Sequence, residues 1–141
     1  MKKEITVEDY NNRINSVIDY IEKNIEKSFD LERLAEIANF SKFHFHRIFK
    51  AFTGETLNDF ILRLKIERSC STIKHNPNYP LIDVAYDLGF QTPSSFSKAF
   101  KKYTGISPNK FKKNSNIEKV IIHKESYNFS EIDKKIKNIQ E

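Results

Sequence analysis

Apolar side chains recur every three or four residues from near the start of the chain to about residue 113, and this is the spacing of amphipathic helices. The first stripe predicts a helix over residues 7–27. Thr6 lies just before it and Asp9 follows three positions later, which is the arrangement of a capping box. The stripe consists of Tyr10, Ile14, Val17, Ile18, Ile21 and Ile25.

The later stripes contain one unit in two copies, over residues 31–60 and 81–111, whose helix-turn-helix parts are residues 31–54 and 81–105. Each copy predicts a short helix, a tight turn and a second helix, which is the layout of a helix-turn-helix DNA reader. The second copy has one extra residue near Thr92–Ser94. The matched positions include Leu31, Ala35, Phe40, Phe45, Phe49, Lys50, Thr53, Gly54 and Phe60, which recur as Leu81, Ala85, Phe90, Phe96, Phe100, Lys101, Thr104, Gly105 and Phe111.

The residues at the turns agree with this layout. In the first copy we expect helices over 31–38 and 42–52, with Asn39 in the left-handed conformation between them. In the second copy Gly89 takes the place of Asn39, and the second helix is expected over 93–104. Caps are expected at Asp30, Ser41 and Thr92, and a helix stop at Gly54.

Between the copies, residues 56–75 predict one long helix, which Asn76–Pro80 ends. About twenty residues at ~1.5 Å each make a rod of ~30 Å, close to the ~34 Å between successive major-groove faces of B-DNA. A short last helix is expected from Pro108 to about Lys113. The predicted fold is all-α, with about seven helices over residues 7–113. Two homeodomain-like helix-turn-helix subdomains are joined by the long linker helix.

Residues 114–141 contain no part of the repeat. A strand is possible at residues 120–122, and a helix with a narrow apolar stripe is possible after Ser130. The pattern assigns no role to this tail.

Charge is distributed unevenly along a chain whose net charge is +5. Residues 1–36 hold nine acidic side chains, whereas residues 88–117 hold six lysines and no acid. A positive field concentrated on the second copy is what a phosphate-contacting surface needs. Cys70 is the only cysteine, so a disulfide framework is excluded and a reducing compartment is expected. Without a long apolar run or a signal-peptide pattern, a cytoplasmic protein that contacts no membrane is expected.

The motifs of common enzyme sites are missing from the sequence. There is no glycine-rich phosphate loop, paired-carboxylate site or nucleophile elbow. His44 and His46 are two positions apart on a predicted helix, so they face different directions, and no second cluster completes a metal site. Cys70 lies mid-helix without a His/Asp arrangement nearby in the sequence that could activate it, and it is expected to be inert. We therefore expect no enzyme activity, no cofactor and no metal.

Two stretches of the repeat resemble the AraC/XylS family of bacterial transcription regulators. They are GFQTPSSFSKAFKKYTGISPNKFK, residues 89–112, and ANFSKFHFHRIFKAFTGETLNDFI, residues 38–61. The resemblance covers about residues 10–113 and is to short members without a preceding sensor domain. It implies a seven-helix, bilobed DNA-binding domain that activates, or sometimes represses, promoters through contact with RNA polymerase.

The resemblance also implies which side chains meet DNA. Phe43, His46 and Arg47 would serve the first reader, with Ser41 near phosphate, and Lys98 stands where many members carry Arg. Lys65 likewise stands where the linker helix often has Arg. From their outward positions we add lysines as an electrostatic footprint. The full candidate set is Ser41, Lys42, Phe43, His46, Arg47 and Lys50 in the first copy and Thr92, Ser94, Ser95, Ser97, Lys98, Lys101 and Lys102 in the second.

For several of these residues a plainer interpretation stays open. Arg47 would contact a base or a phosphate, or remain a solvated surface charge. The serines would bond DNA or simply supply the polarity of a helix start. At the level of the whole chain, we expect a monomer that reads an asymmetric duplex site. The alternative is the DNA-binding half of a longer effector-sensing regulator whose tail begins a ligand or dimerisation domain.

Overall fold

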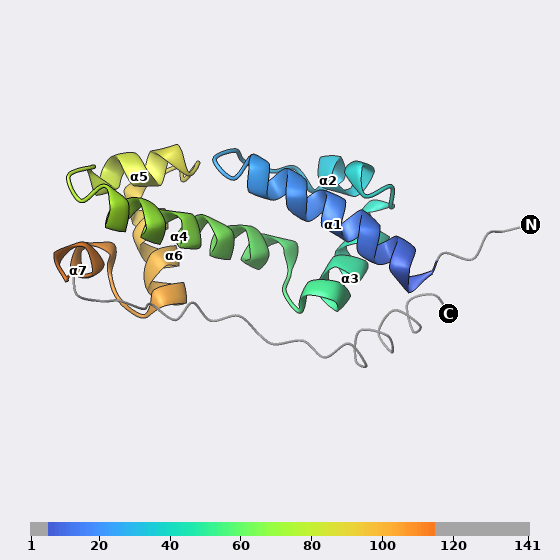
Figure 1. Cartoon of the computed structure of the whole chain (residues 1–141). Coiled ribbons are helices and arrows are strands. Elements are labelled where there is room, and N and C mark those ends of the chain that lie inside the picture. The colour runs from blue at the N-terminus through green and yellow to red at the C-terminus, as the bar shows by residue number, and fades with distance from the viewer. Residues whose placement is uncertain (1–5, 115–141) are drawn as a thin grey trace, which may run out of the picture. The chain divides into compact units, whose positions relative to one another are not determined.

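The computed structural model describes residues 6–114, and in this part of the chain all regular structure is helical (Figure 1). Seven helices follow one another there, which confirms the predicted all-α class. They are α1 (Val7–Lys23), α2 (Leu31–Ile37), α3 (Lys42–Thr53), α4 (Leu57–His75), α5 (Leu81–Asp87), α6 (Pro93–Thr104) and α7 (Pro108–Lys113). The possible strand at 120–122 and the possible helix after Ser130 lie outside the described residues.

The described residues group into two compact units. The first unit holds residues 6–24 and 29–60, and the second holds residues 25–28 and 61–114. Helix α4 therefore begins in the first unit and continues in the second. None of the helices in this part of the chain combines the length and the apolar character needed to span a bilayer.

Helix α1 is shorter than predicted, because it ends at Lys23 and not at residue 27. Asn24 caps it, since its backbone N–H bonds to the carbonyl of Ile21 and its side-chain amide donates to the carbonyl of Tyr20 at 2.8 Å. An asparagine that bonds the backbone of the preceding turn competes with continuation of the helix. The expected capping box at Thr6 is confirmed, and the other predicted bounds agree with the structure to within one residue.

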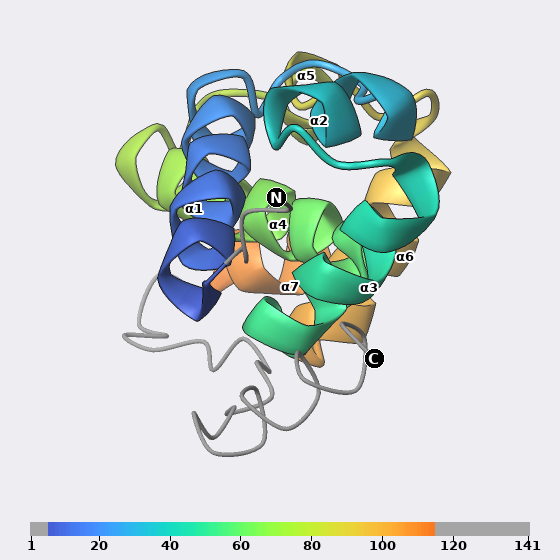
Figure 2. The same ribbon diagram turned by 90° about the vertical axis from the view of Figure 1, so that its right-hand side faces the viewer.

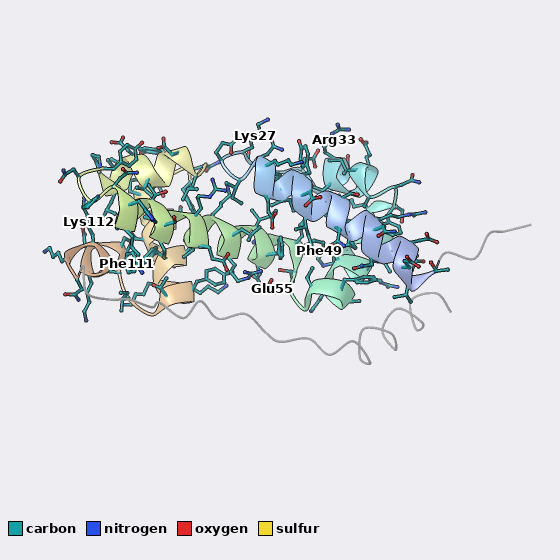
Figure 3. All side chains as sticks on the ribbon, viewed as in Figure 1. Lys27, Arg33, Phe49, Glu55, Phe111 and Lys112 are labelled. Carbon is teal, nitrogen blue, oxygen red and sulfur yellow. The ribbon has the colours of Figure 1, made fainter. Side chains whose placement is uncertain are left out.

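In the first unit, α1, α2 and α3 each pack against the other two (Figure 2). Phe49 lies in this core (Figure 3), with its ring centroid 5.8 Å from that of Phe45 and 5.2 Å from that of Phe60, which it meets edge-on. This packing fixes which side of α3 is buried. The buried apolar residues include Ile14, Val17, Ile21, Leu34, Ala35, Ala38, Phe45, Ile48 and Phe49.

The second unit repeats the arrangement around α6. Phe100 lies 5.7 Å from Phe96 and 5.5 Å from Phe111, measured between ring centroids. Ile66 and Ile73 bring α4 into the same core. The three rings therefore occupy the positions that Phe45, Phe49 and Phe60 occupy in the first unit, as the repeat predicts. The cluster comprises Ile66, Ile73, Val84, Ala85, Leu88, Phe96, Phe100, Tyr103 and Phe111.

Both long second helices end on the same Thr-Gly pair. The hydroxyl of Thr53 donates to the carbonyl of Phe49 at 2.8 Å and accepts from the backbone N–H of Glu55 at 3.2 Å. Gly54 follows with φ of +78°, in the left-handed conformation expected of a helix stop. Thr104 and Gly105 repeat these features in the second unit, with a hydroxyl–carbonyl distance of 2.7 Å and φ of +84°.

The turns between the paired helices use different residues for the same backbone conformation. Asn39 has φ of +58° and Gly89 has φ of +82°, as predicted. A Cβ atom at Gly89 would lie 2.6 Å from the carbonyl oxygen of Glu26 and 3.3 Å from Nζ of Lys65. The second turn therefore requires glycine for space as well as for conformation.

We expect Gly89→Ala to destabilise the protein more than Gly105→Ala. Both glycines have nearly the same positive φ, but a Cβ at Gly105 meets no atom within 4 Å. Alanine at Gly105 should cost about 1–2 kcal/mol for the left-handed conformation alone. At Gly89 overpacking against the backbone should add about 1–3 kcal/mol. Chemical denaturation followed by circular dichroism measures both, and equal losses would show that residues 25–28 yield to a methyl group without cost.

We also expect the Cys70 thiol to react slowly in the folded protein. Burial raises the pKa of Cys70 from 9.0 to about 11, against the opposing effect of Lys74. At pH 8 this lowers the thiolate fraction by about 100-fold, and the thiolate is the reactive form. A thiol-specific disulfide reagent added to native and to urea-unfolded protein at pH 8 measures the ratio of rates. A similar rate in both states would contradict the buried, inert assignment.

Candidate nucleic-acid interface

Helix α3 is divided into a buried and an exposed side. Phe45, Ile48 and Phe49 are fully buried, whereas Phe43 exposes 83% of its surface, an unusual value for a large apolar side chain. Around Phe43 the helix presents polar and basic groups to solvent, as predicted. The exposed candidates of this helix and its cap are Ser41, Lys42, Phe43, His46, Arg47 and Lys50.

The start of α3 is built by a local cap. The hydroxyl of Ser41 accepts a hydrogen bond from the backbone N–H of His44 at 3.4 Å, which confirms Ser41 as the N-cap. Lys42 pairs with Glu32 of α2 at 3.8 Å, and both side chains are largely exposed, so the pair contributes little stability. Among the described residues, the side chain of Arg47 meets no polar partner and stays available to a ligand.

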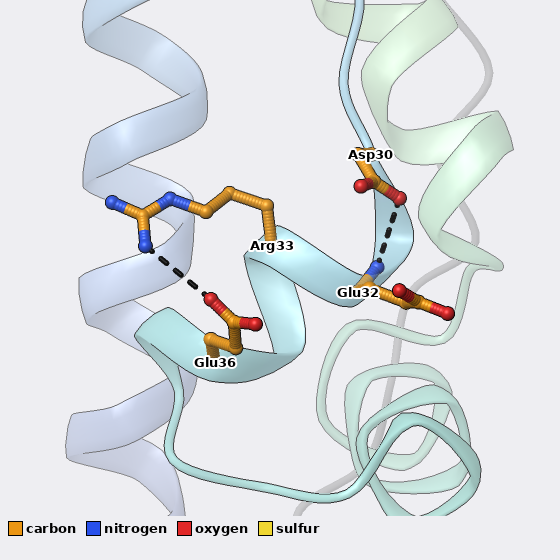
Figure 4. Close-up of polar contacts among 4 residues, drawn as sticks. All are labelled: Asp30, Glu32, Arg33 and Glu36. Carbon is orange, nitrogen blue, oxygen red and sulfur yellow. Dashed lines mark hydrogen bonds and ion pairs between the residues drawn. The ribbon is translucent and has the colours of Figure 1, made fainter.

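Helix α2 carries its own charges, and these are satisfied locally (Figure 4). The carboxylate of Asp30 accepts from the backbone N–H of Glu32 at 3.2 Å, which confirms the predicted cap. Arg33 and Glu36 form an exposed ion pair at 3.4 Å. Of α2 and α3, it is therefore α3 that exposes basic side chains, Arg47 and Lys50, without a carboxylate partner among the described residues.

The turn before α3 is held by α1. Nη1 of Arg13 donates to the carbonyl of Asn39 at 3.1 Å, and its guanidinium lies 4.9 Å from the centroid of the Phe40 ring. Phe40 in turn stacks on His44, with centroids 5.5 Å apart. His44 is half-buried and His46 is exposed, so the two histidines face different directions as predicted. No group of three or more possible metal ligands occurs within residues 6–114.

The start of α6 uses two of the predicted DNA-contacting residues for its own structure. The hydroxyl of Thr92 accepts from the backbone N–H of Ser95 at 3.1 Å and lies 2.8 Å from the Ser95 hydroxyl. Thr92 is thus the N-cap, with Pro93 at the first helical position. Ser94, Ser97 and Lys98 are exposed. A role of Thr92 and Ser95 toward DNA remains a prediction, and it would have to coexist with this cap.

The basic surface of the second unit comes from α6 and α7. Lys98, Lys101 and Lys102 of α6 are exposed, and Nζ of Lys102 lies 5.3 Å from the centroid of the Tyr103 ring. Lys112 of α7, labelled in Figure 3, is one of the six lysines of residues 88–117, but it is half-buried and donates to the carbonyl of Tyr79 at 3.3 Å. Its side chain is therefore tied to the second unit itself. No acidic residue interrupts this surface over residues 88–114.

Sequence reasoning missed the two cations that bond the turns, Arg13 and Lys65. Lys65 is only 6% exposed, although it reads as a surface residue of α4. One signal was available, because Lys65 follows Ile61 by four positions and precedes Ser69 by four, so all three share one side of the helix. Arg13 likewise follows Tyr10 by three positions, so these two residues share one side of α1.

Comparison with known proteins agrees with this geometry. A helix-turn-helix domain family matches residues 34–114, more than half of the chain. The multiple antibiotic resistance protein MarA of Salmonella typhimurium, and likewise that of Escherichia coli K12, is 32% identical over 99 residues. The match covers 70% of this chain and 77% of MarA.

Two solved structures share the fold. A transcriptional regulator from Chromobacterium violaceum, of the proteins with an AraC-type DNA-binding domain, superposes with a TM-score of 0.70 at 17% identity, covering 77% of this chain and 96% of that one. The DNA-binding domain of AdpA, solved in complex with a target DNA, superposes with a TM-score of 0.65 at 23% identity, covering 72% and 90%. The repeated helix-turn-helix architecture, the family match and the likeness to MarA together show that this chain belongs to the AraC/XylS family of transcription regulators and carries its DNA-binding domain.

Proposed function

We propose that residues 7–113 act as one tandem domain that binds an asymmetric duplex site as a monomer, with α3 and α6 in successive major-groove faces. The observation that carries this proposal is the repeated division of both helices. Each buries a pair of phenylalanines one turn apart and turns polar and basic residues outward. An α-helix fits the width of the major groove, where base edges distinguish all four base pairs.

In the first unit, the exposed groups of α3 match the chemistry of the groove. Arg47 supplies the planar donors that pair with the O6 and N7 edge of guanine. Phe43 supplies an exposed apolar ring of the kind that contacts a thymine methyl group. His46 lies beside Arg47 on the same exposed side and donates or accepts at a base edge, while Ser41 and Lys42 contact phosphate.

In the second unit, the exposed groups are shorter. Ser94 and Ser97 allow α6 to approach the base edges closely, and Lys98 contacts them with a single ammonium group. Lys101 and Lys102 bind phosphates, as does Lys50 in the first unit, and this positions the helices without reading sequence. The chain thereby regulates promoters in the cytoplasm through contact with RNA polymerase. The family of transcription regulators to which it belongs supports this part of the proposal.

Selection of bound duplexes from a random pool tests the proposal directly. Purified protein is incubated with the pool and excess competitor DNA, and bound duplexes are sequenced over several rounds. Two elements about 10 bp apart without mirror symmetry are expected from a monomer with two readers. A single short element would remove one helix from the reading role. The absence of any enriched sequence would overturn sequence-specific binding.

We expect Arg47→Ala to weaken binding to the selected duplex by about 1–3 kcal/mol, because a bidentate base contact is lost. Binding to random duplex should weaken only a few-fold, since one positive charge is removed. Arg33→Ala is the matched control, because Arg33 is an exposed arginine of the same unit that pairs with Glu36. Fluorescence anisotropy at fixed salt gives the affinities of the native protein and of both variants for each duplex. Equal losses on selected and random duplexes would assign Arg47 to phosphate.

Removing both Lys101 and Lys102 should weaken binding to all duplexes alike. Each lost phosphate contact reduces the slope of log K against log salt by about 0.9, so the double alanine variant should lose about 1.8 in slope. Lys23→Ala combined with Lys27→Ala removes the same charge from two exposed lysines outside the basic segment and should leave the slope nearly unchanged. An unaltered slope in the first variant would exclude Lys101 and Lys102 from the footprint.

A further inference from the structure

Lys65 of α4 is a buried cation that the proposed DNA contacts do not use. It is 6% exposed, and its Nζ donates to the carbonyls of Ile25 at 2.6 Å, Lys27 at 3.0 Å and Leu88. An ammonium group has three donors, so these three carbonyls satisfy it completely. Burial lowers the pKa of Lys65 to about 8, while the carboxylate of Glu26 opposes the shift, so the group stays mostly charged at pH 7.

The three carbonyls belong to places where a helix has just ended. Ile25 and Lys27 follow the end of α1, and Leu88 is the C-cap residue of α5. The C-cap carbonyl of Leu88 lacks an N–H partner within its helix, and the end of a helix favours positive charge, whereas Ile25 and Lys27 lie in the turn just after α1. All these residues pack in the second unit. Lys65 therefore joins residues 25–28 to the turn that leads into α6.

Gly89 makes this junction tight. The backbone of Glu26 approaches so closely that a Cβ at Gly89 would lie 2.6 Å from its carbonyl oxygen. On the helix side, the N–H of Gly89 bonds to Tyr86 at 3.0 Å and that of Phe90 to Ala85 at 3.1 Å. The turn is thus hydrogen-bonded to α5 and to Lys65 of α4 and lies close to the backbone of Glu26, and α6 begins only four residues after Gly89.

The first unit contains a similar contact between a cation and its turn, with fewer hydrogen bonds. Arg13 donates one hydrogen bond to the carbonyl of Asn39, in the turn before α3, and the bond is exposed. In both units a cation from the helix that braces the helix-turn-helix therefore bonds a carbonyl of the turn. Lys65 differs from Arg13 because it is buried and bonds two carbonyls of residues 25–28 as well as the turn carbonyl of Leu88, so the second turn depends more strongly on its cation.

We propose that Lys65 is a positioning residue for DNA recognition by α6. By donating to the carbonyls of Ile25, Lys27 and Leu88, it fixes the turn at Gly89. This turn sets the direction in which the side chains of Ser94, Ser97 and Lys98 point away from the core. This inference rests on the proposed reading of duplex DNA by α6. Loss of the Lys65 contacts should weaken base discrimination only at the DNA element that α6 reads. A general loss of stability would weaken binding at both elements.

The first test compares discrimination at the two elements of the selected site. Each element is scrambled in turn, and the ratio of Kd for the scrambled and the intact duplex is measured. The element read by α6 is the one whose base preference changes in Lys98→Ala. Lys65→Met, which keeps the length but loses the charge and donors, should reduce the ratio at that element about tenfold and leave the other ratio unchanged.

Two further variants separate positioning from stability. Lys65→Arg restores a permanent cation with several donors and should recover most of the lost discrimination. Ile73→Val removes one methyl group from the same buried cluster without touching the turn and should leave both ratios as in the native protein. If circular dichroism shows that Lys65→Met does not fold, Lys65→Gln takes its place. Retained discrimination in the folded variant, or the same loss in Ile73→Val, would overturn the proposal.

A second readout needs no DNA. In 15N-labelled protein, the backbone amide signals of Gly89, Phe90, Thr92, Ser94 and Ser95 should shift in Lys65→Met and return towards their native positions in Lys65→Arg. If random-pool selection enriches no sequence, the proposed function fails while these signals still decide whether Lys65 positions the start of α6. Changes confined to residues 25–28 would refute the positioning role even if specific DNA binding is intact.

Discussion

In each unit, two phenylalanines one helical turn apart are buried against a third. This packing determines which side of α3 and of α6 faces solvent. Phe45 and Phe49 pack with Phe60 in the first unit, and the corresponding rings of α6 pack with Phe111 in the second. Rings at positions four apart must enter the core together, so the helix cannot rotate about its axis without exposing one of them. The opposite side of each helix is then committed to solvent. Because the exposed side is fixed, the ordinary polar residues on it form a surface of constant orientation.

The two units apply this arrangement to different surface chemistry. Helix α3 exposes an arginine, a histidine and the ring of Phe43, whereas α6 exposes serines and lysines. Their turns also differ, because Asn39 takes the left-handed conformation as an exposed residue, while Gly89 lies against the backbone of Glu26. A duplicated scaffold therefore carries two unequal exposed surfaces, which is the physical basis for the asymmetric site that we propose.

Most of the fold could be predicted because its determinants are local. Caps such as Ser41 and Thr92, stops such as Gly54 and the spacing of the phenylalanines are all contained within a few residues. The end of α1 could not be predicted in this way: an apolar stripe continues to Ile25, but Asn24 turns back on the helix and the carbonyls beyond it bond to a lysine forty positions away. The exposure of the candidate DNA-contacting residues could be predicted from the helical spacing of the apolar positions. The sequence did not show that Thr92 and Ser95 bond to each other or that Lys112 bonds to Tyr79.

The distances along the chain that Lys65 bridges have a consequence for how the protein folds. The Thr-Gly stops of α3 and α6 join residues at most four apart, so they can form as soon as each helix does. The bonds of Lys65 join residues separated by 40, 38 and 23 positions, and such contacts require a large loss of chain entropy before they form. The ends of α3 and α6 thus depend on local contacts alone. The turn before α6 is completed only when residues 25–28, from much earlier in the chain, have packed against it.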